Sequence, residues 1–147
     1  MMRRLIILLF LVVTLVASKG VGLGIILGEP TGISLKSWIA SKNAIDFGIG
    51  WSFTRERVHI IGDYLFHFPE WVREPDWYPY LGVGGRLKIW DDGDKTKFNL
   101  GVRFGIGIEY IYERFGFFGE LYPVMDLVPE TDFDLEGGIG ARFYFTR

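Results

Sequence analysis

Ser52, His59 and Asp63 have the residue types of a hydrolase with a serine nucleophile, and they lie within one stretch of twelve residues. In such an enzyme the histidine must reach both the serine and the acid by hydrogen bonds, which spacing along the chain does not establish. His59 and the second histidine, His67, both fall on the polar face of an alternating segment. We therefore expect the histidines to belong to a polar network, and we expect no enzymatic activity.

Asp91, Asp92 and Asp94 surround Gly93 and could suggest a calcium loop. Their spacing does not match the twelve-residue EF-hand loop with its terminal glutamate. Asp and Gly together commonly form turns without a metal. The chain also has no cysteine with which to build a disulfide or a thiolate metal site. The sequence therefore predicts no metal and no cofactor.

A larger set of charged and titratable residues shares the polar face of the alternating segments. Two roles are open for this set: a selectivity path or gate for ions, and a structural network. Because an unpaired charge in a narrow interior is costly, such residues must be paired and hydrogen-bonded. We favour the structural network, since a small barrel leaves little room for water. The set comprises Lys36, Asp46, His59, Asp63, Arg86, Lys88, Arg103, Glu109, Glu120, Asp134, Glu136 and Arg142.

The stretch from Phe98 to Tyr110 shows most clearly which elements must position these residues. Its even-numbered positions are all large and apolar or aromatic, and its odd-numbered positions are Gly, Asn, Arg or Glu. A strict period of two over thirteen residues is the pattern of a β-strand. Such a strand is long for a globular protein and is about the length that crosses a bilayer at a tilt.

Similar alternating segments recur from Val21 onward, separated by turn-forming residues. We expect eight strands, over residues 21–28, 32–40, 44–53, 58–68, 80–90, 98–110, 115–126 and 133–145. The connections alternate between two ends. Those over residues 29–32, 54–57, 91–97 and 128–132 share one end, and those over 41–43, 69–79 and 112–114 share the other.

Eight antiparallel segments with short connections predict an all-β fold, a closed up-and-down barrel that leaves no strand edge exposed. With the apolar face inward, about three dozen large side chains would have to fit an interior of this width, which is too narrow for them. The opposite face, dominated by glycine and charged residues, does fit. Apolar residues outside and polar residues inside are the pattern of a transmembrane barrel. Aromatic residues near the strand ends suit two interfacial girdles: Trp51, Phe53, Phe66, Phe68, Tyr80, Trp90, Phe98, Tyr110, Phe115, Phe133, Phe143 and Phe145.

The N-terminus has the organisation of a secretory signal peptide. Arg3 and Arg4 precede an almost unbroken apolar run, and small residues then offer a cleavage site after Ala17 or Ser18. The apolar run is short for a helix that stays in the membrane. We therefore expect residues 1–18 to be a cleaved leader and residues 19–147 to form the barrel. The formal net charge of −2 and the lack of a clustered basic surface argue against nucleic acid as a partner.

Taken together, the leader, the eight segments and the glycine-rich polar face resemble the small outer-membrane barrels typified by the OmpA transmembrane domain and OmpX. The last strand, with Gly140, Phe143 and Phe145, resembles the C-terminal signal that the outer-membrane assembly machinery recognises in such barrels. Residues 27–36 resemble the first hairpin of uncharacterised small barrels of this kind. The resemblance implies a monomer in the outer membrane that contacts lipid and the assembly machinery. Some such barrels modify lipid A, but no activity is implied for this chain.

Three functions remain open from the sequence. The leading hypothesis is an integral outer-membrane barrel with a structural or surface-interaction role and an interior filled by an ionic network. The second is a narrow passive pore or ion-gated channel, and the third is a soluble secreted barrel that binds a small apolar ligand. The longest connection, over residues 69–79, falls at the end expected to face the periplasm, although periplasmic turns are usually short. Either a strand boundary lies elsewhere, or this segment packs beneath the barrel as a plug or docking surface.

Overall fold

The computed structural model describes residues 2–8, 20–29, 31–52 and 57–145. Residues 2–8 are helical, in agreement with the helix expected for a signal peptide. The expected cleavage site after Ala17 or Ser18 lies outside the described residues, as does Phe53 of the expected girdles. Within the described ranges, no helix is long and apolar enough to cross a membrane.

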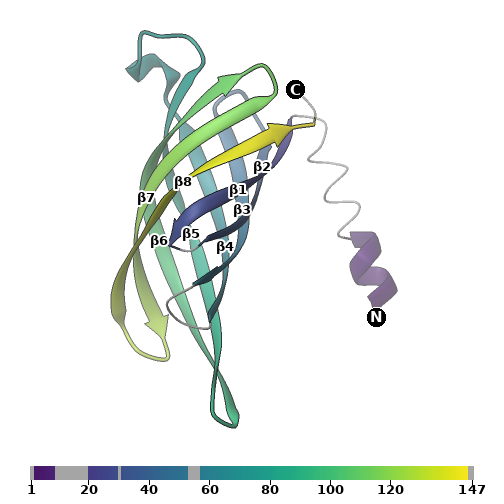
Figure 1. Cartoon of the computed structure of the whole chain (residues 1–147), viewed down its shortest axis with the longest axis vertical. Coiled ribbons are helices and arrows are strands. Elements are labelled where there is room, and N and C mark those ends of the chain that lie inside the picture. Colours follow the sequence, from purple (N-terminus) through teal and green to yellow (C-terminus); the bar gives the residue numbers. More distant parts are fainter. Residues whose placement is uncertain (1, 9–19, 30, 53–56, 146–147) are drawn as a thin grey trace.

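The rest of the described chain is a closed antiparallel barrel, as the sequence predicts (Figure 1). Each strand pairs with the next one along the chain, and β1 pairs with β8 to close the sheet. The strands are β1 (Val21–Glu29), β2 (Thr31–Trp38), β3 (Asn43–Ser52), β4 (Arg57–His67), β5 (Trp77–Asp92), β6 (Lys95–Tyr112), β7 (Phe115–Val128) and β8 (Asp132–Tyr144). We call the end that carries the first residue of β1 and the last residue of β8 the terminal end, and the opposite end the hairpin end.

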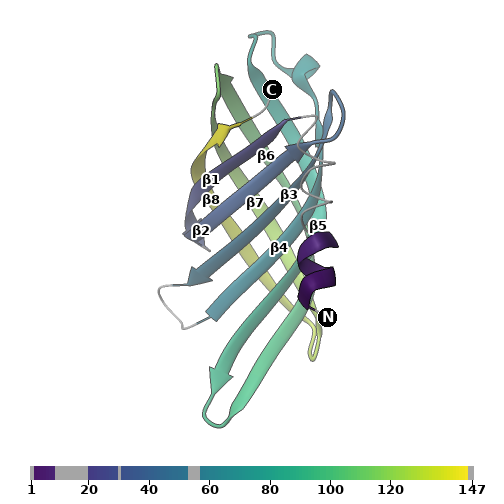
Figure 2. The same ribbon diagram turned by 90° about the vertical axis from the view of Figure 1, so that its right-hand side faces the viewer.

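The loop expected over residues 91–97 is wrong. Asp92 pairs with Lys95, so that only Gly93 and Asp94 form the turn. Gly93 has a φ of 65°, a left-handed conformation that glycine adopts without strain. The side chain of Thr96 donates a hydrogen bond to that of Asp91 across the two strands. Figure 2 shows the result, a β5–β6 hairpin that projects beyond the other strands at the hairpin end.

The expected connection over residues 69–79 is too long, because β5 begins at Trp77 rather than at Tyr80. Pro79 is tolerated there because its nitrogen faces the end of β4 rather than the ladder with β6. The Pro79 carbonyl accepts a hydrogen bond from the Phe68 amide at 2.7 Å. The Phe68 carbonyl accepts instead from the Trp71 amide, so it does not need an N–H donor at Pro79. A short 3₁₀ helix, η1 (Pro69–Trp71), contains no buried residue. Since none of residues 68–76 is buried, the connection does not plug the barrel. The corrected strand boundary shortens it only slightly, and it is still the longest connection between two strands.

Alternation along each strand separates the two faces of the barrel wall. On β6, Phe104 and Ile106 are 61% and 59% exposed, whereas Arg103, which directly precedes Phe104, is 2% exposed. Tyr80 departs from the expected girdles: it is 2% exposed and lies inside the barrel. The reason is the alternation of side chains along β5: even-numbered positions face inward, and Tyr80 is one of them, like Arg86.

Glycine is required where the inner wall is most crowded. A Cβ atom at Gly32 on β2 would overlap the carbonyl oxygen of Ile49 and the backbone of Gly50 on β3. A Cβ atom at Gly107 on β6 would overlap the ring of Tyr80 on β5. The small residues of the inner face therefore allow strands and large interior side chains to come together in a narrow barrel.

Gly32→Val should prevent the barrel from forming, because the new side chain has no space between β2 and β3. Gly85→Val is the matched control, since a Cβ atom there meets only the Gly101 carbonyl oxygen, at 3.6 Å. The folded form can be detected in detergent by its heat-dependent electrophoretic mobility. A Gly32→Val protein that shows wild-type heat-dependent mobility would contradict this packing.

Candidate functional site in the barrel interior

Polar and charged side chains fill the interior of the barrel. Most of the twelve residues predicted from the sequence are buried there; the exception is Asp134, whose side chain is 45% exposed at the hairpin end. Their contacts form three groups along the barrel: a terminal cluster, a central cluster and a mouth cluster.

Glu109 is the acceptor at the centre of the terminal cluster and is completely buried. Lys36 Nζ donates to its Oε1 at 2.7 Å, and Arg142 Nη1 donates to its Oε2 at 2.7 Å. The Tyr144 hydroxyl lies 2.8 and 2.9 Å from the two carboxylate oxygens. Because these residues come from β2, β6 and β8, one carboxylate joins strands that are not neighbours in the sheet.

Arg142 extends the terminal cluster toward β3. Its Nη2 donates to the Ser34 hydroxyl at 3.1 Å, and Ser34 in turn donates to Asp46 at 3.1 Å. The guanidinium also lies 3.9 Å from the centre of the Phe118 ring. A planar cation that is hydrogen-bonded and lies over an aromatic face is well suited to a buried site.

Arg103 is the cation of the central cluster. Its Nε lies 3.1 Å from Asp63 and its Nη2 lies 3.6 Å from Glu120. Its Nη1 donates to Glu136 at 3.1 Å. The guanidinium stacks 3.9 Å from the centre of the Tyr122 ring, which is completely buried. A single arginine thus contacts three carboxylates from β4, β7 and β8.

Arg86 organises the mouth cluster near the hairpin end. Its Nη2 donates to both oxygens of Asp126, at 2.8 and 2.9 Å, and its Nη1 donates to Asp134 at 3.1 Å. Lys88 lies 3.7 Å from the same Asp134 oxygen. Glu136 connects this cluster with the central one: its Oε2 lies 3.2 Å from Arg86 and its Oε1 accepts from Arg103.

An aromatic layer lies inside the terminal end. The ring centroids of Trp38 and His67 are 4.0 Å apart, and His67 lies 5.4 Å from the Tyr80 ring. Tyr78 meets Trp38 edge-on at 5.7 Å. Lys36 Nζ reaches this layer through a 2.8 Å hydrogen bond to His67 Nε2. Large rings therefore occupy the interior between the terminal cluster and the barrel end.

The predicted set omits Ser34, Asp126 and Tyr144, which complete these contacts. All three occupy inward-facing positions in the alternation of their strands, so the sequence pattern does indicate them. The partners of each charge were not predictable, since they lie on strands far apart in the sequence.

The residues considered for a hydrolase are not arranged as a triad by their described contacts. His59 Nδ1 lies 3.0 Å from Glu136, while Asp63 is paired with Arg103. The side chain of Ser52 is outside the described part of the chain. Among the described residues, no group of three or more His, Asp or Glu side chains has the arrangement of a metal site.

Two solved outer-membrane barrels are similar to this structure. The N-terminal β-barrel domain of Pseudomonas aeruginosa OprF matches with a TM-score of 0.62 and 16% identity, over 86% of this chain and 96% of that chain. Neisserial surface protein A (NspA) matches with a TM-score of 0.57 and 16% identity, over 86% of this chain and 94% of that chain. No family model and no curated protein matches the sequence. At this identity the likeness shows the fold, that of a small outer-membrane barrel.

Glu109→Ala should destabilise the barrel by about 3–5 kcal/mol, because it leaves Lys36 and Arg142 as buried charges without their main partner. Denaturant unfolding in detergent micelles measures the change. Glu70→Ala is the matched control: Glu70 pairs with Lys42 at 3.5 Å, with both side chains about half exposed. Loss of this exposed pair should cost less than about 1 kcal/mol. Equal effects of the two substitutions would contradict a stabilising role for the terminal cluster.

Proposed function

We propose that this protein is an integral outer-membrane β-barrel with a structural or surface-interaction role and no catalytic activity. The observation that carries the proposal is the outer wall, to which every strand contributes a large apolar side chain that is 39–67% exposed. These residues, one for each strand in order, are Ile25, Ile33, Ile49, Ile60, Leu81, Phe104, Leu121 and Ile139. A belt of this kind around a closed barrel is suited to the hydrocarbon core of a bilayer.

The same belt argues against a soluble barrel that binds an apolar ligand. Soluble monomers rarely expose a contiguous apolar patch larger than a few hundred Å². A ligand of that kind would also need an apolar cavity, whereas the interior of this barrel is occupied by Glu109, Arg103, Arg86 and their partners. Membrane insertion explains both the apolar outer face of the barrel wall and its polar inner face.

A structural role for the interior residues is favoured over an ion path. The charges are bound to one another across the interior, with Glu136 joining the central and mouth clusters. The aromatic layer at the terminal end adds a second obstacle, with Trp38 against His67 and Tyr78. Ions would have to displace paired charges and large rings together. The interior therefore favours a closed barrel over a passive pore.

The hairpin end is the part best suited to surface interaction. With the terminal end in the periplasm, the projecting β5–β6 hairpin would face the outside of the cell. Its tip places exposed Asp91, Asp94, Lys95 and Lys97 beyond the mouth of the barrel. The last strand, β8, would be the segment bound by the assembly machinery after removal of the leader. We propose a monomer, since one chain closes the sheet by itself.

Phe104→Lys should strongly reduce insertion into lipid vesicles, because it places a charge on the outer wall. A lysine at the bilayer midplane costs about 2–4 kcal/mol in barrels of this type. Phe104→Leu is the matched control and should insert normally. After folding into vesicles, insertion is measured as the fraction of protein that resists protease and shows heat-dependent electrophoretic mobility. Normal insertion of Phe104→Lys would contradict the proposed orientation of the wall.

Cysteine labelling of cells tests location and orientation together, since the chain has no native cysteine. Asp94→Cys in the β5–β6 turn should react with a membrane-impermeant maleimide on intact cells. Arg73→Cys in the β4–β5 connection should react only after the outer membrane is permeabilised. The reverse pattern would overturn the orientation, and labelled protein in the soluble fraction would overturn the membrane location.

A further inference from the structure

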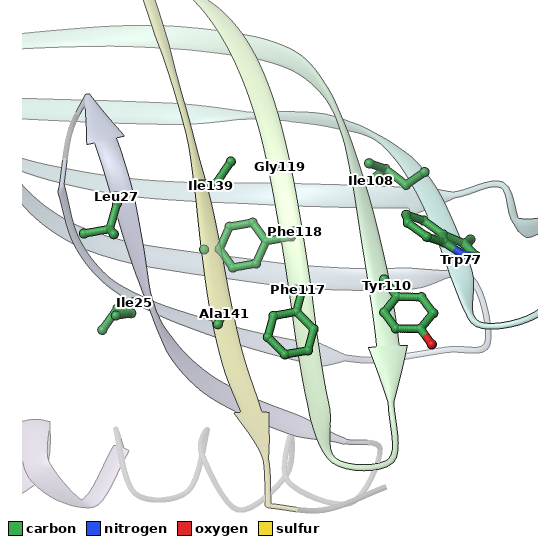
Figure 3. A pocket seen from close by; sticks show the side chains of 11 residues that line it. Ile25, Leu27, Trp77, Ile108, Tyr110, Phe117, Phe118, Gly119, Ile139 and Ala141 are labelled. Atoms are coloured by element: carbon green, nitrogen blue, oxygen red, sulfur yellow. The ribbon is translucent and has the colours of Figure 1, made fainter.

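An apolar groove of about 580 Å³ crosses the outer wall near the terminal end, from the start of β5 over β6, β7 and β8 to β1 (Figure 3). The strand pairings place its residues in two adjacent rows. Tyr110, Phe117 and Ala141 are cross-strand neighbours in one row. Gly119 and Ile139 are neighbours in the next. Within the groove, the smallest outward-facing residues are Gly119 and Ala141, which lie between larger ones and form its shallow part.

Gly119 is not required by the packing of the barrel itself. A Cβ atom there would meet Ile139 Cγ2 at 3.8 Å and the Gly138 carbonyl oxygen at 4.0 Å, which are ordinary contacts. By contrast, a Cβ atom at the neighbouring inward-facing Gly140 would overlap the Phe118 ring. Packing within the barrel thus explains why residue 140 is glycine, but it does not explain why residue 119 is glycine. What glycine does at position 119 is keep the groove open toward the membrane.

The groove changes in polarity toward the terminal end. Its lining contains no charged side chain, and only Trp77 and Tyr110 carry polar atoms on their rings. Amphipathic aromatic residues of this kind are enriched at the level of the lipid headgroups. Beyond them, the β6–β7 turn carries the exposed Arg114, whose Nη1 donates to the Phe145 carbonyl at 3.0 Å. That hydrogen bond holds the guanidinium at the end of β8, beyond the outward-facing pair Phe115 and Phe143 that follows the groove on this side.

This arrangement is complementary to a phospholipid. The apolar body of the groove suits an acyl chain, and the cationic Arg114 suits the phosphate of a headgroup. Glu113 in the same turn offsets the charge of Arg114, so a headgroup without net charge fits better than an anionic one. A second copy of the chain fits less well, because the groove has 11 lining residues and a stable protein interface has about 20–30 on each side.

We propose that the groove binds one acyl chain of a zwitterionic phospholipid, with the headgroup phosphate beside Arg114. The proposal rests on the membrane location proposed above and adds a specific lipid site to it. Bound lipid would cover the shallow wall at Gly119 and Ala141.

Native mass spectrometry of the detergent-purified barrel with added dioleoyl phosphatidylethanolamine tests the groove. Wild type should retain one phospholipid per chain, and Gly119→Leu should lower this retention at least tenfold by filling the groove. Gly85→Leu is the matched control, an outward glycine on β5 that also has room for a Cβ atom and lies outside the groove. Equal retention by wild type and Gly119→Leu overturns the proposal, and so does a dimer that only Gly119→Leu abolishes.

A second variant tests the headgroup. Arg114→Gln removes the charge but keeps a donor for the Phe145 carbonyl. It should weaken retention of phosphatidylethanolamine several-fold and leave retention of dioleoylglycerol, which lacks a phosphate, unchanged. An equal effect on both lipids overturns the assignment of Arg114.

Fractionation of cells that express wild type separates failure of the site from failure of the proposed function. Wild type in the outer-membrane fraction, with undiminished lipid retention by Gly119→Leu, overturns the groove alone. Wild type in the soluble fraction overturns the membrane location on which the proposal rests.

Discussion

The narrow interior of an eight-stranded barrel is the constraint on which the rest of this structure depends. It cannot accept the large apolar residues that make up half of each strand, so those residues face outward and the small and charged ones face inward. Glycine is needed where strands and rings crowd the inner wall, as at Gly32 and Gly107. Charges that enter such a space lose water and must find partners, which explains why cations and carboxylates alternate along the interior.

Paired charges contribute specificity as well as stability. Replacement of a buried ion pair by apolar residues is often neutral, so the pairs alone are weak evidence of a stable fold. Their effect on register is stronger, because a shift by one residue would turn every charge of a strand toward lipid. Glu109 binds partners from β2 and β8, and Arg103 binds partners from β4, β7 and β8. Glu109 and Arg103 can each make these contacts only when several strands are in the correct register. We therefore infer that the network favours one arrangement of the sheet.

Alternation made the barrel, its strand order and the inward face predictable from the sequence, because a period of two is a local property. Strand ends were less predictable. In the β5–β6 hairpin, polar residues of the 91–97 stretch pair across the two strands, so the strands continue to the turn at Gly93. Pro79 fits into β5 because its nitrogen faces the end of β4. The partners of each charge depend on register and on strands far apart in sequence, which no local pattern contains. Tyr80 shows the remaining difficulty, since an aromatic residue suits both a girdle and a crowded interior.

A closed interior is the central claim, because it separates a structural barrel from a channel. The paired charges of the terminal, central and mouth clusters and the rings of Trp38 and His67 occupy the path between the two ends. Single-channel recording in planar lipid bilayers tests this claim most directly, with purified wild-type protein refolded and its insertion verified. The structure predicts no stepwise conductance at neutral pH and moderate voltage. A stable, reproducible conductance step from the inserted wild-type barrel would contradict it.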